Sequence, residues 1–150
     1  NLMRLIIAGS RTITVTIEQL DSFLAEFLEY SDYMKAEIVS GMAQGVDKCG
    51  EKYANWYKLK LHKFPADWEK FGKPAGIIRN HQMAEFADAA LVIWDGRSRG
   101  SMNMKATMKK LGKPVCEVII PDMGKQAQIQ KDDNLKLLEG FWKKINEDSV

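Results

Sequence analysis

The chain has 150 residues, enough for one domain that buries about two-thirds of the surface exposed by its unfolded chain. Hydrophobic residues make up 45% and charged residues 28%, as in an ordinary globular protein, so disordered and fibrous classes are excluded. The formal net charge of +2 and the pI of 8.5 are too mild to indicate nucleic-acid binding by bulk electrostatics.

No apolar run approaches the roughly 20 residues that a membrane span needs, and the N-terminus has no signal segment. We therefore expect a cytoplasmic protein without a membrane partner. Cys49 and Cys116 lack metal-ligand spacing, and only His62 and His81 accompany them. We expect reduced cysteines, no metal site and no cofactor.

Apolar runs typical of strands alternate with segments of helical spacing along the chain. In chain order we expect a strand over Arg4–Ala8, a helix over Ile17–Tyr30, a strand over Glu37–Ser40, a helix over Gly45–Tyr57, a strand over Leu59–Phe64, a helix over Pro74–Ala87, a strand over Ala89–Trp94, a helix over Met102–Leu111, a strand over Pro114–Ile120, a loop over Pro121–Lys131 and a helix over Asp133–Ile145. This alternation predicts an α/β fold: a three-layer sandwich around a mainly parallel sheet of about five strands, with right-handed crossovers.

The apolar faces of three helices follow from their spacing. The helix after the second strand should bury Val46, Cys49, Tyr53 and Trp56. The helix before the fourth strand should bury Ile77, Ile78, Met83, Ala84 and Phe86. The last helix carries an apolar stripe of Leu135, Leu138, Phe141, Trp142 and Ile145. We expect residues 3–120 to form the ligand-binding domain, and residues 121–150 either to fold back onto it or to form a homodimer.

Two glycine-bearing segments each follow a predicted strand and precede a predicted helix. They are Ala8-Gly9-Ser10-Arg11 and Ser40-Gly41-Met42-Ala43-Gln44-Gly45-Val46-Asp47. A strand that ends in glycine lets the backbone approach a ligand, and the N-terminus of the next helix attracts anions. Glycines that only make tight turns would give the same pattern. Because two such segments occur in one short domain, we expect a phosphate-bearing ligand.

In open α/β sheets, ligands bind beyond the carboxyl ends of the strands. The candidate ligand-binding residues at those ends, and on the helix before the fourth strand, are Gly9, Ser10, Arg11, Ser40, Gly41, Gly45, Asp47, Asp67, Trp68, Arg79, Asn80, Asp95, Gly96, Ser98, Gly100 and Ser101. Several of them have a second interpretation. Arg11 and Arg79 can hold a phosphate or lie on the surface, Asp47 can bind a ribose hydroxyl or cap its helix, and Trp68 can stack on a base or close the core. His81 has no partner evident nearby in sequence, so we do not expect it to be catalytic.

Five motifs in order resemble the YspA-related branch of the SLOG superfamily. They are Ile6-Ala8-Gly9-Ser10-Arg11, Val39-Ser40-Gly41-x-Ala43-x-Gly45-Val46-Asp47, Phe64-Pro65-Ala66-Asp67-Trp68, Arg79-Asn80-x-x-Met83 and Trp94-Asp95-Gly96-x-Ser98-x-Gly100-Ser101. The resemblance covers about Met3 to Ile119 and implies a Rossmann-like domain that binds a nucleotide or a nucleotide derivative. One position departs from the pattern, because Met42 stands where the family usually has glycine.

Two related families imply different activities. Arg79, Met83, Gly100 and Ser101 match motifs of the Lonely Guy phosphoribohydrolases, but the catalytic glutamate of that family falls on Met104. The DNA-processing protein A family shares the second motif and the Arg79-Asn80 pair, and it binds single-stranded DNA. A groove for such a strand would be lined by Arg97, Arg99, Lys105, Lys109 and Lys110, although a run of charges is more often just a solvated helix face.

The sequence therefore favours a sensor or binding module for a nucleotide-type small molecule, in a pocket at the strand carboxyl ends. A glycosidic or phosphate hydrolase using Asp47, Glu51 or Asp95 is the first alternative. A single-stranded DNA-binding protein is the second.

Overall fold

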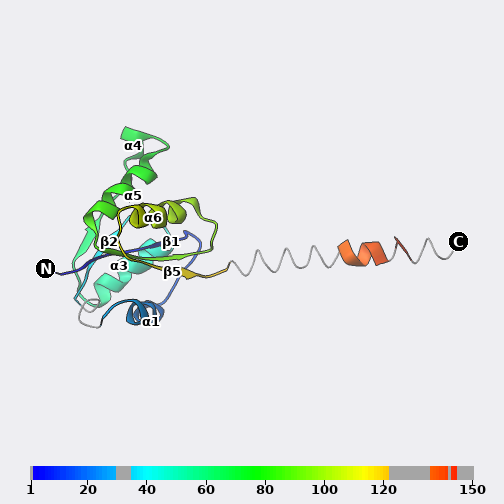
Figure 1. The fold of residues 1–150 in the computed structure, drawn as a ribbon, viewed down its shortest axis with the longest axis horizontal. Coiled ribbons are helices and arrows are strands. Elements are labelled where there is room, and N and C mark those ends of the chain that lie inside the picture. Colours follow the sequence, from blue (N-terminus) through cyan, green and yellow to red (C-terminus); the bar gives the residue numbers. More distant parts are fainter. Residues whose placement is uncertain (1, 30–34, 122–135, 142, 145–150) are drawn as a thin grey trace. The chain divides into compact units, whose positions relative to one another are not determined.

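The computed structural model describes residues 2–29, 35–121, 136–141 and 143–144. The chain divides into two compact units, Asn1–Ile120 and Pro121–Val150. The first unit is an α/β domain, coloured blue to yellow in Figure 1. In the second unit residues 136–141 are helical, within the range predicted for the last helix. The predicted loop after Pro121, and Leu135, Trp142 and Ile145 of the apolar stripe, lie outside the described residues.

The first unit is built on a parallel sheet. Its strands are β1 (Arg4–Gly9), β2 (Glu37–Ser40), β3 (Leu61–Lys63), β4 (Ala89–Trp94) and β5 (Val115–Ile119). They lie in the order β3-β2-β1-β4-β5, and every neighbouring pair is parallel. Each connection between consecutive strands contains a helix, as parallel pairing requires. The predicted α/β class with a five-stranded parallel sheet is confirmed.

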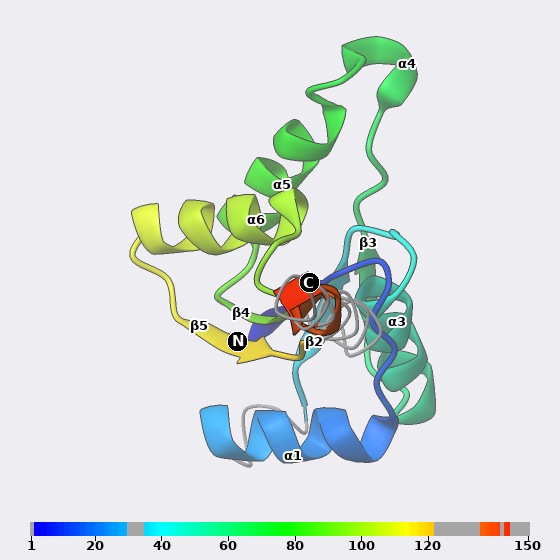
Figure 2. The ribbon, with the colours of Figure 1, turned by 90° about the vertical axis from the view of Figure 1, so that its right-hand side faces the viewer.

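Helices cover both faces of the sheet. They are α1 (Ile17–Phe27), α3 (Val46–Trp56), α4 (Trp68–Phe71), α5 (Ala75–Phe86) and α6 (Arg99–Lys110). Figures 1 and 2 show α1 and α3 on one face and α5 and α6 on the other, with α4 beyond the sheet at the start of α5. Within the described part of the chain, no helix is long and apolar enough to cross a membrane.

Alternate side chains of the central strands enter two separate cores. Ile7 of β1 belongs to the core under α1 and α3, together with Tyr53. Its neighbour Ile6 belongs to the opposite core with Met83 and Met108, under α5 and α6. All six residues of β4 are buried. Burial on both faces explains the continuous apolar run from which this strand was predicted.

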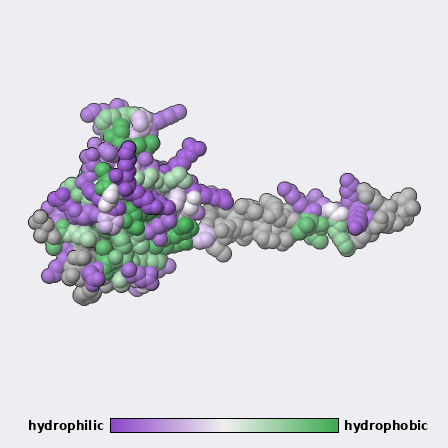
Figure 3. Space-filling view, viewed as in Figure 1, coloured by the Kyte–Doolittle hydropathy of each residue, from purple (hydrophilic) through white to green (hydrophobic). Residues whose placement is uncertain are grey.

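The sheet ends at β5, whose side chains are only partly covered. Three of its residues are half-buried and two, Glu117 and Ile119, are exposed, Ile119 to 56%. Figure 3 shows hydrophobic residues gathered on the visible face around this edge. The edge is therefore the more apolar part of that face, whereas hydrophilic and hydrophobic residues are mixed over α4 and α5.

Several predicted elements differ from the structure. Helix α1 ends at Phe27 rather than Tyr30, because Leu28 is already extended, and β3 spans Leu61–Lys63 rather than Leu59–Phe64. Helix α4 was not predicted, because it is a single turn held by a local cap: the Asp67 carboxylate accepts a hydrogen bond from the Lys70 amide at 3.0 Å. Helix α6 begins at Arg99 rather than Met102. The prediction placed Gly100 before the helix, but a glycine is tolerated in the first turn, where the amides have no helical partner.

Two apolar side chains that were predicted to face the sheet are exposed instead. Trp56 is 69% exposed because it lies on the last turn of α3, at the margin of the stripe formed by Val46, Cys49 and Tyr53. Ile77 is 58% exposed, since the buried face of α5 is formed by Ala75, Asn80, Met83 and Ala84. Helical spacing thus located the stripes correctly but made each of them too wide.

Helix α3 ends in a left-handed residue that is not glycine. Lys58 has a φ of 56° and follows the last helical turn. Its amide donates to the Asn55 carbonyl at 3.3 Å, and the Leu59 amide donates to the Ala54 carbonyl at 2.8 Å. This hydrogen-bond pair is a Schellman motif, in which glycine is the usual residue because it has no side chain to strain the backbone.

We therefore expect Lys58→Gly to raise the free energy of unfolding by about 0.5–1 kcal/mol, the relief of left-handed strain exceeding the added chain entropy. Urea denaturation measures the change. Lys52→Gly is the matched control, because Lys52 is also an exposed lysine but lies inside α3, where glycine should lower stability by about 1 kcal/mol. A loss of stability in Lys58→Gly would contradict the prediction.

Candidate functional site

The strand order places a candidate site at one edge of the sheet. The chain winds from β1 outward to β3, then crosses back to β4 on the other side of β1. Connections on the two sides of β1 therefore leave in opposite directions, and this is where open α/β sheets bind ligands. The residues that follow β1, β2 and β4 all lie at this edge.

The two glycine segments meet there, as predicted. The Val46 amide donates to the Ser10 carbonyl at 3.3 Å, which joins the turn after β2 to the segment after β1. Gly45 has a φ of 78°, and a Cβ at this position would lie 2.4 Å from the Ser10 carbonyl oxygen and 2.6 Å from that of Arg11. Only glycine fits so close to the Ser10–Arg11 backbone.

Gly9 and Ser10 join β1 to β4. A Cβ at Gly9 would lie 1.7 Å from the Ile93 carbonyl oxygen, so its glycine is explained by strand packing. The Ser10 amide donates to Ile93 at 3.0 Å, and the Ser10 hydroxyl accepts from the Asp95 amide at 3.0 Å. The buried Ser10 side chain therefore positions the loop after β4.

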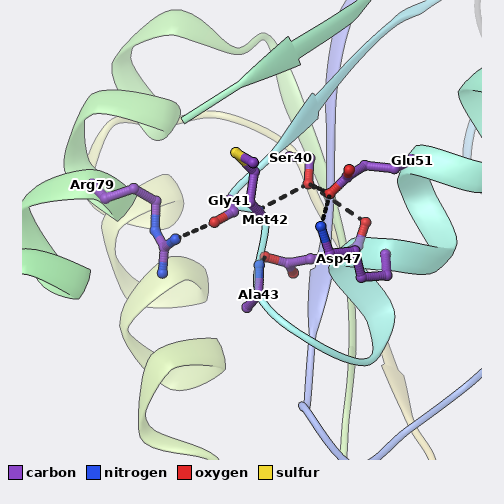
Figure 4. A network of polar contacts seen from close by, with 8 residues as sticks. Ser40, Gly41, Met42, Ala43, Asp47, Glu51 and Arg79 are labelled. Atoms are coloured by element: carbon purple, nitrogen blue, oxygen red, sulfur yellow. Dashed lines mark hydrogen bonds and ion pairs between the residues drawn. The ribbon is translucent and has the colours of Figure 1, made fainter. Parts of the chain in front are cut away.

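Arg79 reaches from α5 to the turn after β2. Figure 4 shows its guanidinium directed at Gly41, where Nη1 donates to the carbonyl oxygen. Nε donates to the Asn80 side-chain oxygen at 3.1 Å. A Cβ at Gly41 would lie 2.8 Å from Nη1 of Arg79 and 2.9 Å from Oδ2 of Asp47. The missing side chain at Gly41 therefore lets an arginine and a carboxyl group close over the same turn.

Asp47 is a buried carboxyl group in the first turn of α3. Its Oδ2 accepts from the Ala43 amide at 3.1 Å. Burial raises the pKa of Asp47 from 3.8 to about 6, and the proximity of Glu51 adds to this; hydrogen bonds from Ala43 and Gly9 and the charge of Arg79 act in the opposite direction. The carboxyl group is thus poised to gain or lose a proton near neutral pH.

The guanidinium of Arg79 is also partly removed from water. Burial lowers its pKa, the nearby Arg11 lowers it further, and Asp47 opposes both effects. Arg11 is therefore close enough to act on the same charges, although its own side chain is exposed. The edge thus combines two arginines with one buried carboxyl group.

Ser40 and Glu51 hold the base of the same turn. The Ser40 hydroxyl donates to Oε2 of Glu51 at 2.9 Å and accepts from the Met42 amide at 3.0 Å. Lys48 lies 3.5 Å from the same carboxylate. Ser40 has no exposed surface, so its hydroxyl cannot meet a ligand, and Glu51 is engaged in shaping the turn. Met42 adopts a φ of 65°, which explains why glycine suits this position better.

The loop after β4 is shaped by Asp95. Its Oδ1 accepts from the amides of Arg97 at 2.8 Å and Ser98 at 2.9 Å. These hydrogen bonds lower the pKa of Asp95 and keep it ionised, and the one from the Arg97 amide has the largest effect. Gly96 supplies the left-handed residue of the turn, with a φ of 81°. Asp95 is thus suited to hold the loop and poorly suited to donate a proton.

Asn80 links α5 to α6. Its side-chain amide donates to the Gly100 carbonyl and to the side-chain oxygen of Asn103, each at 3.1 Å. The Ser98 hydroxyl donates to that of Ser101 at 2.7 Å. Asn103 was not a predicted site residue, and only its position on the first turns of α6 could have indicated it. Because Asn80 also accepts a hydrogen bond from Arg79, it connects Arg79 to the start of α6.

Two other sequence interpretations change in the structure, and Asp67 has a structural role there. Trp68 is 52% exposed, so the interpretation as a core residue is wrong. The Asp67 carboxylate caps α4, as described above. His81 does have a partner, because Nε2 lies 2.9 Å from Oε1 of Glu85 one helical turn away; both side chains are exposed, and the pair lies on the outer face of α5.

Met104 is a core residue. It is 1% exposed and packs in the core under α5 and α6. In this structure a carboxylate at position 104 would therefore lie among apolar side chains. Among the described residues, no group of three or more His, Cys, Asp or Glu side chains converges as metal ligands do.

The basic side chains after β4 are only partly available for a DNA strand. Nζ of Lys105 lies 2.6 Å from Oε2 of Glu117, which also accepts from the Trp94 indole at 2.8 Å. The exposed basic residues of this group are Arg97, Arg99, Lys109 and Lys110. Binding of single-stranded DNA through them stays a prediction.

A phage protein shares much of this sequence. Over 120 residues the chain is 34% identical to the Gene 61 protein of Mycobacterium phage D29, an alignment covering 75% of this chain and 93% of the phage protein. The chain belongs to the family of that protein. No protein-family model matches the chain, and no solved structure gives a significant match. The name of the phage relative gives a gene number and no activity.

The raised pKa of Asp47 predicts how stability depends on pH. Between about pH 4 and 6 the folded carboxyl holds a proton that the unfolded chain has released, so this group lowers stability as pH rises through that range. We expect Asp47→Asn, which removes the charge, to raise the free energy of unfolding by about 1–3 kcal/mol at pH 7.5, with the difference shrinking toward pH 4.5.

Urea denaturation at several pH values tests this, with Asp95→Asn as the control. Because hydrogen bonds lower the pKa of Asp95, its charge stabilises the fold above its unfolded pKa, and the asparagine variant should be less stable at pH 7.5. Equal pH profiles for wild type and Asp47→Asn would refute the assignment of a buried, poorly solvated carboxyl group.

Proposed function

We propose that the chain binds a nucleotide or a nucleotide-derived ligand at the carboxyl ends of β1, β2 and β4, as a sensor or binding module. The observation that carries this proposal is the cluster at the turn after β2, where Arg79 and Asp47 close over Gly41. Buried charges that folding alone does not favour are typical of functional sites. The cluster also lies at the sheet edge where α/β domains bind nucleotides.

The chemistry of the cluster suits a phosphate attached to a sugar. A guanidinium group donates charge-assisted hydrogen bonds to phosphate oxygens. Nε and Nη1 of Arg79 hold the side chain in place, and Nη2 is the nitrogen that would donate to a ligand. Arg11 adds a second positive charge nearby. The carboxyl group of Asp47 is an acceptor for a ribose hydroxyl, the usual role of an acidic residue in such sites.

We also propose that the Gene 61 family belongs to the YspA-related branch of the SLOG superfamily. Residues of four of the five motifs meet at one edge of a sheet with a Rossmann-like strand order: Ser10 contacts Asp95, Arg79 contacts Gly41, and Asn80 contacts Gly100. This arrangement gives the motifs a common physical purpose, which supports the proposal.

A hydrolase that cleaves a glycosidic or phosphate bond is a second candidate, favoured by one observation. A carboxyl group with a pKa near 6 suits general acid–base catalysis at neutral pH, and Asp47 has that property. Glu51 and Asp95 are engaged in holding their turns, which leaves Asp47 as the candidate catalytic residue.

Thermal unfolding with a panel of nucleoside mono- and diphosphates and ADP-ribose tests binding. A ligand at 100 times its Kd adds about 2.7 kcal/mol of stability, or about 5–10 °C in Tm for a chain of this size. We expect Arg79→Gln to lose most of the ligand-induced shift. Lys52→Gln removes the same charge from the exposed face of α3 and should keep it.

The same samples separate a binding module from an enzyme. We expect no release of free base or phosphate over many turnovers from any nucleotide that binds. Sustained release that is abolished in Asp47→Asn would establish the hydrolase. Absence of any shift across the whole panel would refute nucleotide binding.

A further inference from the structure

Trp68 presents its indole to solvent on α4. The side chain is 52% exposed, and among the described residues it makes no ring or cation contact. The neighbouring Phe71 is covered, since Nζ of Lys70 lies 5.0 Å from its ring centroid. Helix α4 is capped by Asp67 and ends at Gly72, which has a φ of 63°, so its single turn is locally well defined. The backbone that carries this uncovered indole is thus locally well defined.

Gly76 places this indole beside the candidate site. A Cβ at Gly76 would lie 3.6 Å from Cη2 of Trp68 and 3.9 Å from Nη2 of Arg79. Both are ordinary van der Waals separations, so one atom above Gly76 touches the indole and the guanidinium together. The same guanidinium donates to the Gly41 carbonyl through Nη1. Arg79 therefore connects the turn after β2 to the surface above Gly76.

We propose that Trp68 is a stacking platform for the planar base of the ligand, which lies over Gly76 while its phosphate lies by the turn after β2. Every nucleobase has a π-face that stacks on an aromatic ring. A ligand without a planar base would leave the indole uncovered. This inference rests on the proposed function and deepens it, because it assigns recognition of the base to the α4–α5 segment.

The test compares ligands with and without a base on the full-length chain. Calorimetry measures the Kd of adenosine, guanosine, cytidine and uridine 5′-monophosphates and of ribose 5-phosphate. For the nucleotides that bind, we expect Trp68→Ala to weaken affinity about tenfold to a hundredfold and Trp68→Phe to weaken it less. The Kd of ribose 5-phosphate should stay within about twofold, because that ligand has no base to stack.

Two further variants separate stacking from damage to the fold. Gly76→Leu fills the surface between Trp68 and Arg79 while improving helix propensity, and it should weaken nucleotide binding without lowering Tm. Trp56→Ala removes another exposed indole, at the far end of α3, and should leave every Kd unchanged.

The outcomes distinguish the two proposals. If ribose 5-phosphate binds wild type as tightly as every nucleotide, or if Trp68→Ala weakens both kinds of ligand equally, the stacking platform is refuted and phosphate binding stands. If neither nucleotides nor ribose 5-phosphate bind to wild type, the proposed function fails and this inference fails with it.

Discussion

The charged cluster at the turn after β2 determines how the helices meet the head of the sheet. Arg79 donates from α5 to the Gly41 carbonyl, and Asp47 at the start of α3 accepts from the Ala43 amide within the same turn. Helices on opposite faces of the sheet are thereby fixed to one backbone segment. The positions of Asn80 and the α4–α5 segment follow from that of Arg79.

This cluster opposes stability as well as organising the edge. Burial raises the pKa of Asp47 although Arg79 lies beside it, which shows that loss of hydration outweighs the attraction between the two charges. Burial likewise lowers the pKa of Arg79. A fold selected for stability alone would gain from neutral side chains here, so the retained charges favour a role in binding.

The glycines at this edge have different physical reasons. Gly9 is required because β4 passes too close for a side chain, and Gly45 because its φ is positive next to the Ser10–Arg11 backbone. Gly41 leaves room for two charged groups to approach each other. The first two would be needed in any protein with this packing, whereas the third serves the charged cluster. Of the glycines in the motifs, Gly41 therefore carries most of the functional argument.

The sequence by itself determined the α/β class and the approximate bounds of the strands and main helices over residues 4–120, because apolar runs and helical spacing are local signals. The sequence also predicted that the segments after β1 and β2 lie at one edge of the sheet, since parallel strands end on the same side. Tertiary structure alone decided which side chains meet there. Arg79 and Gly41 are separated by 38 residues, and their contact depends on where α5 packs against the sheet. The exposure of Trp68 and the burial of Met104 were likewise set by packing between elements, which no periodicity within a single helix reveals.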